Sequence, residues 1–206
     1  MLADPAGRLI AATVRSGFDV VAVAASAGGL NALTHVLGRL PADFPVPLVV
    51  VQHLDPRHRS AMAEILGRRT KLRVKQAAED DRVEPGHVYI APPAHHLLVN
   101  ADARLSLTRT ELVHFVRPSA DLLFESVAAS FKERAIAVVL SGSGVDGAMG
   151  VRAIKKMGGT VVVQDAQDAD FNGMPEAALA TGAADFVLAL DEIAAALRKL
   201  CSPSDD

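Results

Sequence analysis

The feature that most constrains the fold is an alternation of short apolar runs with segments of helical period. VVAVAA (20–25), PLVVVQ (47–52) and AIAVVL (135–140) have the length and composition of buried strands. Between the first two, leucines recur three or four residues apart from position 30 to position 40, as on one face of a helix. This alternation predicts an α/β fold, with a mainly parallel, doubly wound sheet and helices on both faces.

Near residues 83–110, strand-like segments follow one another without helical segments between them. HVYIAP (87–92), HHLLVN (95–100) and ARLSLT (103–108) are three short strand-like segments, and Asn100-Ala-Asp-Ala supplies a turn between the last two. We therefore expect an antiparallel hairpin portion here.

Length and composition limit the class of protein. The 206 residues predict one domain at 18–201, an N-terminal extension at 1–17 and a polar tail at 202–206. No apolar run approaches the ~20 residues of a membrane span, and Asp4-Pro5 is unlike a signal peptide. The single cysteine, Cys201, excludes an internal disulfide and a multi-cysteine metal site. We expect a cytoplasmic protein that is not embedded in a membrane, and the net charge of -3 argues against nucleic acid as the main partner.

One polar residue stands at a corner of the predicted sheet. In VVAVAASAGGLNAL the first strand ends at Ser26, and Gly28-Gly29 permits a tight turn into the following helix. The free N–H groups and the dipole of such a helix can stabilise an oxyanion beside an exposed hydroxyl, as in a nucleophile elbow. The alternative is that Ser26 only caps the helix.

A base and an orienting carboxylate are found after two other strands. His53 follows the second strand, and Asp146 lies in the glycine-rich loop after AIAVVL. Because parallel strands end at the same edge of a sheet, the three side chains can form a Ser-His-Asp triad, which is recognised by geometry and not by chain order. Taken alone, His53 could be a surface histidine, and Asp146 could cap the helix that follows it.

These residues lie in motifs that resemble the catalytic domain of the CheB family, the chemotaxis receptor protein-glutamate methylesterases. The resemblance runs from about residue 18 to 200 and rests on the motifs AASAGGLNAL, VQHLDP, VEPGHVYIAPPAHHLLV, RPSADLLFESVA, VVLSGSGVDGAMGVRAIKKMGG and GMPEAALATG. It implies Ser26 as nucleophile, His53 as general base and acid, and Asp146 as the residue that orients His53. It also implies hydrolysis of glutamate methyl esters on chemoreceptor cytoplasmic helices to glutamate and methanol, and in some members deamidation of glutamine.

The resemblance also supplies the oxyanion donors. The turn common in the family is Ser-Thr-Gly-Gly, where this chain has Ser-Ala-Gly-Gly, and the backbone N–H of Ala27 is retained. The second donor is expected to be the amide of Ser143. No metal or cofactor is required by this mechanism.

The typical receiver domain of the family has no counterpart before the first strand, because only about 18 residues precede it. We therefore expect no control by a receiver domain in cis. The sequences Ser-Ala-Gly-Gly-Leu and His-Leu-Asp-Pro resemble those of stand-alone members and of members fused to a methyltransferase. The expected partners are a methylated chemoreceptor or similar protein, and a separate receiver or methyltransferase protein.

A basic stretch follows His53. Between positions 57 and 75 there are seven basic residues and one acid, Glu64. We expect Arg57 and Arg59 to dock an acidic substrate, and Arg117 to line the cleft, although a solvated helix face is the simpler reading.

Two alternatives come from other classes of protein. Gly142-Ser-Gly144-Val-Asp-Gly147 is a G-x-G-x-x-G that follows a strand and opens a helix, and Asp165 ends the next strand, as in a dinucleotide-binding oxidoreductase. The other alternative is a catalytically silent receptor-binding domain. His95 and His96 are interpreted as structural, because no further metal ligands accompany them.

Overall fold

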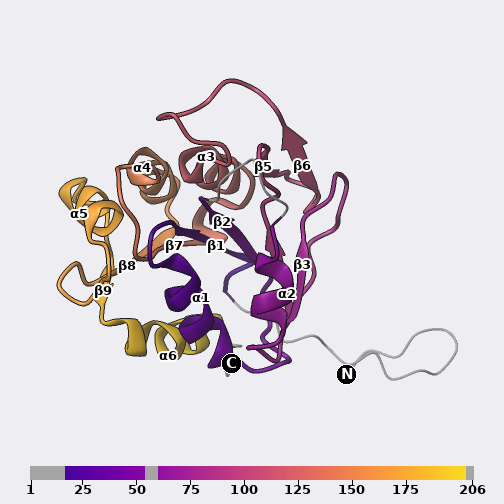
Figure 1. The fold of residues 1–206 in the computed structure, drawn as a ribbon, viewed down its shortest axis with the longest axis horizontal. Helices are drawn as coiled ribbons and strands as arrows, with labels where there is room; N and C mark the ends of the chain where they lie inside the picture. The colour runs from indigo at the N-terminus through magenta and orange to yellow at the C-terminus, as the bar shows by residue number, and fades with distance from the viewer. Residues whose placement is uncertain (1–16, 54–59, 203–206) are drawn as a thin grey trace, which may run out of the picture.

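The computed structural model describes residues 17–53 and 60–202. Its main element is a seven-stranded sheet in the order β3-β4-β2-β1-β7-β8-β9, in which every pairing is parallel (Figure 1). The strands are β1 (Val20–Ala25), β2 (Leu48–Gln52), β3 (Arg73–Gln76), β4 (His87–Ile90), β7 (Ala135–Val139), β8 (Thr160–Gln164) and β9 (Phe186–Leu188). A separate two-stranded antiparallel sheet contains β5 (His96–Val99) and β6 (Leu105–Thr108). The predicted α/β class is confirmed.

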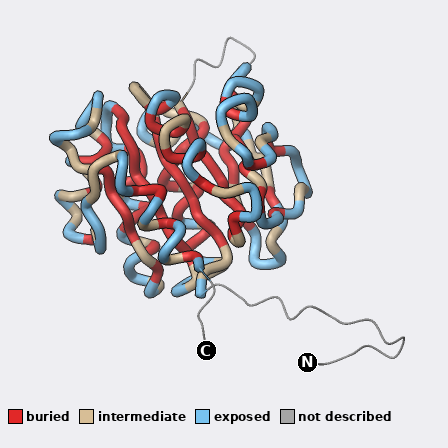
Figure 2. Tube along the Cα trace, turned by 90° about the horizontal axis from the view of Figure 1, so that it is seen from below, coloured by how far each residue is buried: buried red, intermediate tan, exposed pale blue. Residues whose placement is uncertain are grey.

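Helices cover both faces of the main sheet, as the apolar strands require. They are α1 (Gly29–Gly38), α2 (Met62–Gly67), α3 (Ala120–Phe131), α4 (Ala148–Lys156), α5 (Gly173–Ala180) and α6 (Leu190–Cys201). Along β1, Val21, Val23 and Ala25 pack in one core with α1, α2 and α6, while the residues between them pack in a second core with α3, α4 and α5. The central strands are therefore buried on both sides, which is why their sequence is continuously apolar (Figure 2).

The strand order places the first strand, β1, at the centre of the sheet. β1 has β2 on one side and β7 on the other. The strands before β7 are added on one side of β1, and the strands from β7 onward are added on its other side. Such a topological switch point leaves a crevice at the carboxyl ends of the strands, where ligands bind in open α/β sheets. The loops that follow β1, β2 and β7 all begin at this edge.

The antiparallel portion is smaller than the sequence pattern predicted. Only β5 and β6 pair in this way, whereas β4, expected to be part of it, joins the main sheet between β2 and β3. Val88, Tyr89 and Ile90 are consecutive buried residues, as in a strand covered on both faces. β3 was not predicted, because a largely exposed edge strand with two basic residues lacks an apolar signature.

The last helix begins one residue before an acidic residue that would suit an N-cap. Asp191 lies inside the helix, because α6 begins at Leu190 and follows Ala189. The Glu192 carboxylate accepts a hydrogen bond from the Ala189 N–H at 3.2 Å and so satisfies this end of the helix. Within residues 17–53 and 60–202, no helix has the length and apolar character needed to cross a membrane.

Candidate active site

Ser26 lies at the corner that the sequence predicted, directly after β1. Its N–H donates to Ser141 O at 3.0 Å, and a Cβ built on Gly28 would lie only 2.7 Å from Ser141 Oγ. Gly28 has φ +72°, in the left-handed region that favours glycine, and it precedes the first residue of α1. The turn is therefore held by the loop after β7, and it brings Ser26 to the N-terminus of α1.

Gln52 ties the Ser26 turn to the His53 turn. β1 and β2 pair with Ala25 opposite Gln52, so Ser26 and His53 follow neighbouring strand ends. The buried Gln52 amide donates through Nε2 to Ser26 O at 2.7 Å and to His53 O at 3.1 Å. Sequence reasoning missed this role, although a glutamine ending an apolar run was its visible signal. The bridge fixes the two backbones relative to each other.

His53 and Asp146 are 93 residues apart in the sequence and in direct contact. His53 Nε2 and Asp146 Oδ2 are 2.8 Å apart, with side-chain exposures of 13% and 3%. Because an ionised carboxylate only accepts hydrogen bonds, Nε2 carries the proton of this contact, and Nδ1 has no hydrogen bond with another described residue. Ser26 Oγ and the His53 ring, both described, are not hydrogen-bonded to each other here, and such contacts commonly tighten only when substrate binds.

Asp146 lies on the N-terminus of α3, not on that of the helix that follows it. Its Oδ2 accepts from Ala120 N at 2.6 Å, and its Oδ1 accepts from Ser119 Oγ at 2.8 Å and Asp121 N at 3.2 Å. Burial by itself raises the pKa of Asp146, but the hydrogen bonds from His53, Ala120, Ser119 and Asp121 outweigh it, so the pKa is lowered. The carboxylate is therefore ionised and fixed. The alternative that Asp146 caps its own helix is wrong, since α4 follows Gly147 without a side-chain cap.

A buried histidine holds Ser119 in place behind the carboxylate. His96 Nδ1 accepts from Ser119 N at 3.1 Å, and its Nε2 lies 3.0 Å from Glu111 O, to which it donates. His96 and Ser119 are both fully buried. The structural interpretation of His96 is supported, but its link to Asp146 was not foreseen. Ser119 also caps α3, because its hydroxyl accepts a hydrogen bond from Leu122 N.

Two backbone N–H groups near Ser26 are free. Among the described residues, neither Ala27 N nor Ser143 N donates a hydrogen bond. The Ser143 loop is close to the turn, because a Cβ built on Gly142 would lie 2.9 Å from Ser26 Cβ. Both N–H groups are thus available beside the serine side chain.

Of the three arginines expected to dock the substrate, the structure describes only Arg117. Arg57 and Arg59 lie outside the described residues. Arg117 donates through Nη1 to Arg109 O at 3.1 Å and to Thr110 O at 2.6 Å, so part of its guanidinium holds the loop before α3. A docking role for the three arginines stays a prediction.

The glycine-rich loop is not open to a pyrophosphate. Gly142 N donates to Phe171 O at 2.9 Å and Met174 N donates to Gly142 O at 2.8 Å, so the segment before α5 covers the turn. A Cβ built on Gly173 would lie 2.9 Å from Gly144 N. This packing argues against the dinucleotide alternative.

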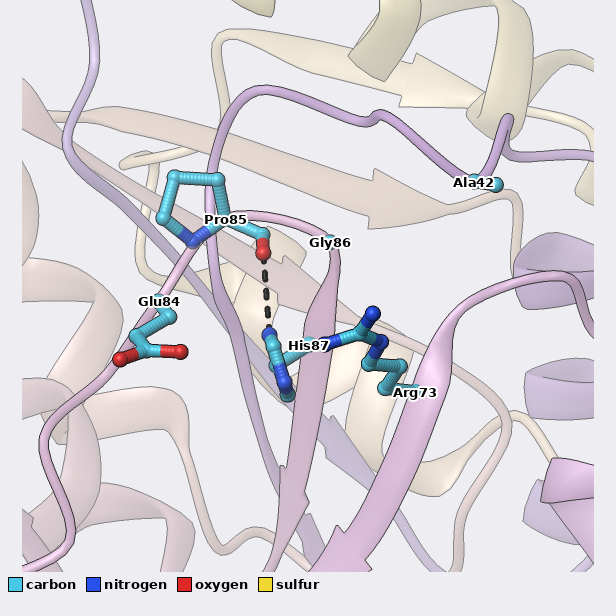
Figure 3. A pocket seen from close by; sticks show the side chains of 6 residues that line it. All are labelled: Ala42, Arg73, Glu84, Pro85, Gly86 and His87. Atoms are coloured by element: carbon cyan, nitrogen blue, oxygen red, sulfur yellow. Dashed lines mark hydrogen bonds between the residues drawn. The ribbon is translucent and has the colours of Figure 1, made fainter.

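A cavity of about 450 Å³ lies at the edge of the sheet opposite to Ser26 and His53 (Figure 3). Arg73 and His87, which line it, begin β3 and β4, whereas Ser26 and His53 follow the carboxyl ends of their strands. No triad residue is among the described residues that line this cavity.

Comparisons with known proteins agree with this geometry. The family model described as CheB methylesterase matches residues 21–197. A putative protein-glutamate methylesterase/protein-glutamine glutaminase of Leptospira interrogans is 38% identical over 177 residues, which cover 86% of this chain and 92% of that protein. The protein-glutamate methylesterase FrzG of Myxococcus xanthus is 42% identical over 180 residues, 87% of this chain and 54% of that protein.

Among solved structures, the CheB methylesterase catalytic domain of Thermotoga maritima superposes with a TM-score of 0.85 at 35% identity. The match covers 89% of this chain and 98% of that one. The sheet and the motifs around Ser26, His53 and Asp146 agree with this match. The chain belongs to the CheB methylesterase family.

Proposed function

We propose that the protein hydrolyses glutamate γ-methyl esters on a chemoreceptor-like protein, with Ser26 as nucleophile, His53 as general base and acid, and Asp146 as the residue that orients His53. The observation that carries the proposal is the His53–Asp146 pair. Its carboxylate is buried and fixed by the α3 N-terminus, its imidazole is mostly buried, and the pair lies beside the strand end that bears Ser26.

The proposed reaction is acyl transfer in two halves. His53 Nδ1 takes the Ser26 proton while Oγ attacks the ester carbonyl carbon, and the N–H groups of Ala27 and Ser143 hold the oxyanion. The protonated ring then gives its proton to the methoxide that leaves as methanol. Water attacks the acyl-enzyme by the same route and releases the glutamate carboxylate and Ser26.

The orientation of the ring differs from the commonest serine-hydrolase arrangement, in which Nδ1 faces the carboxylate and Nε2 faces the serine. In this protein Nε2 faces Asp146, so Nδ1 is the nitrogen that exchanges protons. The chemistry is unchanged, because either nitrogen can be the base when the other is held as a donor.

Deamidation of glutamine is a second candidate activity, favoured by relatives whose names include protein-glutamine glutaminase. It uses the same acyl-enzyme, with ammonia as the leaving group in place of methanol. A cytoplasmic location, and partnership with a separate receiver or methyltransferase protein, remain predictions.

The decisive experiment is methanol release from a methylated chemoreceptor cytoplasmic fragment by the wild type and by Ser26→Ala. We expect release to fall by at least about 10⁴-fold in the variant, as when a triad member is removed. Ser143→Ala is the matched control, because it removes an exposed hydroxyl from the same site but keeps the proposed backbone donor. Equal loss in both variants, or undiminished release by Ser26→Ala, would refute the assignment of the nucleophile.

A further inference from the structure

A cleft of about 590 Å³ extends away from Ser26 on the side opposite the Asp146 loop. It is lined by the turn at Ser26 and by residues of α1 and α2, two helices that lie on the same face of the sheet (Figure 1). Neither His53 nor Asp146 is among the described residues that line it. The reaction needs only the end of the cleft at Ser26, so the rest is available to a part of the substrate that does not react.

The walls of the cleft combine an apolar strip with a single charge. Leu30 and Ile65 expose 38% and 41% of their surface, and both line the cleft. Arg69 is the only charged residue among the described residues of the lining. Its guanidinium makes no ion pair or hydrogen bond with another described residue.

Ser26 and Arg69 lie near opposite ends of α1. Ser26 precedes the helix, while Arg69 O lies 3.0 Å from where a Cβ would stand on Gly38, the last residue of α1. Ten residues at ~1.5 Å each make this helix roughly 15 Å long. Because Ser26 and Arg69 line the same cleft, the distance between serine and guanidinium is within roughly 15 Å, which is up to about ten residues of a helix.

The charges around the cleft are arranged unequally. Asp170 lies at the Ser26 end, where its Cβ would be 2.9 Å from a Cβ on Gly28 and its Oδ2 accepts from Asn31 Nδ2 at 3.4 Å. Neither Asp170 nor the exposed Glu64 of α2 is among the described residues that line the cleft. An anionic side chain is therefore attracted to the Arg69 end of the lining.

We propose that Arg69 is the carboxylate-binding end of a substrate subsite. This inference rests on the proposed function. It adds that protein substrates are selected by an acidic side chain within roughly 15 Å of the ester, with an apolar side chain between them against Leu30 and Ile65. Opposite charge at the exposed Arg69 adds affinity and fixes the direction in which the substrate lies.

The test uses helical peptides that carry one glutamate γ-methyl ester, with Glu or Gln four, seven or ten residues before or after it. We expect the wild type to show a KM roughly 2- to 5-fold lower for one of the Glu peptides than for its Gln counterpart, the range of an exposed ion pair. R69Q should abolish this preference. R68Q is the matched control, because Arg68 is an exposed neighbour outside the cleft lining, and it should retain the preference.

Binding of the same peptides to Ser26→Ala, followed by fluorescence anisotropy, separates this inference from the proposed function. If no ester is hydrolysed but the Glu preference appears in binding and disappears in the Ser26→Ala/Arg69→Gln double variant, the subsite stands and the activity fails. Equal effects of R69Q and R68Q would show long-range attraction without a subsite. Equal treatment of Glu and Gln peptides in both assays would overturn the proposal.

Discussion

Removing the Ser119 hydroxyl should destabilise the protein in a pH-dependent way. The hydroxyl is one of four donors to the buried Asp146 carboxylate, at 2.8 Å, and it also accepts from Leu122 N at 3.5 Å. A hydrogen bond to a charged group contributes about 1.5–3 kcal/mol, and the long cap contact adds about 0.5 kcal/mol. With three donors remaining, Ser119→Ala should lower the free energy of unfolding at pH 7 by about 2–3 kcal/mol, a large part of the ~5–15 kcal/mol of a typical domain.

The sign of the pH dependence follows from the lowered pKa of Asp146. A carboxyl whose pKa is lower in the folded state stabilises the protein above its unfolded pKa, about 3.9, and loses that contribution as the pH falls through the folded value. The difference between wild type and Ser119→Ala should therefore be full at pH 7 and shrink below about pH 4. Urea unfolding at several pH values measures it.

Ser126→Ala is the matched control on the same helix. Ser126 Oγ donates to Leu123 O at 2.8 Å and accepts from Val99 N at 3.1 Å, so its hydroxyl has backbone partners and, among the described residues, no carboxylate partner. Its effect should be the same at pH 7 and below about pH 4, where the effect of Ser119→Ala shrinks. If Ser119→Ala shows the same pH-independent loss, Ser119 acts only as a helix cap and the reasoning about Asp146 is refuted.

Three further predictions concern the site and the core. Asp146→Asn should lower kcat by about 10⁴-fold, because an amide can no longer hold His53 with Nε2 protonated; steady-state methanol release measures it, and a loss under tenfold would contradict the role. Gly29→Ala should destabilise by about 1–3 kcal/mol and reduce activity, since its Cβ would overlap Gln52 Oε1 and lie 2.8 Å from Ala25 Cβ. Gly67→Ala, with its nearest neighbour at 3.8 Å, is the control for both readouts and should be neutral or slightly stabilising in thermal unfolding. Burial raises the pKa of Cys201 to about 12, so iodoacetamide at pH 8 should label it only after unfolding, and rapid labelling of the native protein would contradict its burial.

Much of the fold followed from local patterns. The continuous apolar strands, the helical spacing after Ser26 and the glycine turns identified β1, β2, β7 and β8 and the helices between them, because hydrophobic period and turn chemistry act over a few residues. The same reasoning missed β3, and it identified β4 as a strand but assigned it to the antiparallel portion. An exposed edge strand carries little apolar signal, and a strand of four residues shows too few positions to separate alternation from a continuous run.

The sequence by itself determined that Ser26, His53 and Asp146 each follow a strand, and hence that they could meet at one edge of a parallel sheet. Their motifs also carried the family resemblance that the comparisons confirmed. Tertiary structure alone decided how they are held. That Asp146 binds the N-terminus of α3, that Nε2 of His53 faces it, and that Gln52 and His96 support the site depend on contacts between segments 23 to 93 residues apart. Such contacts are selected by the packing of the whole sheet and its helices, so no local pattern could reveal them.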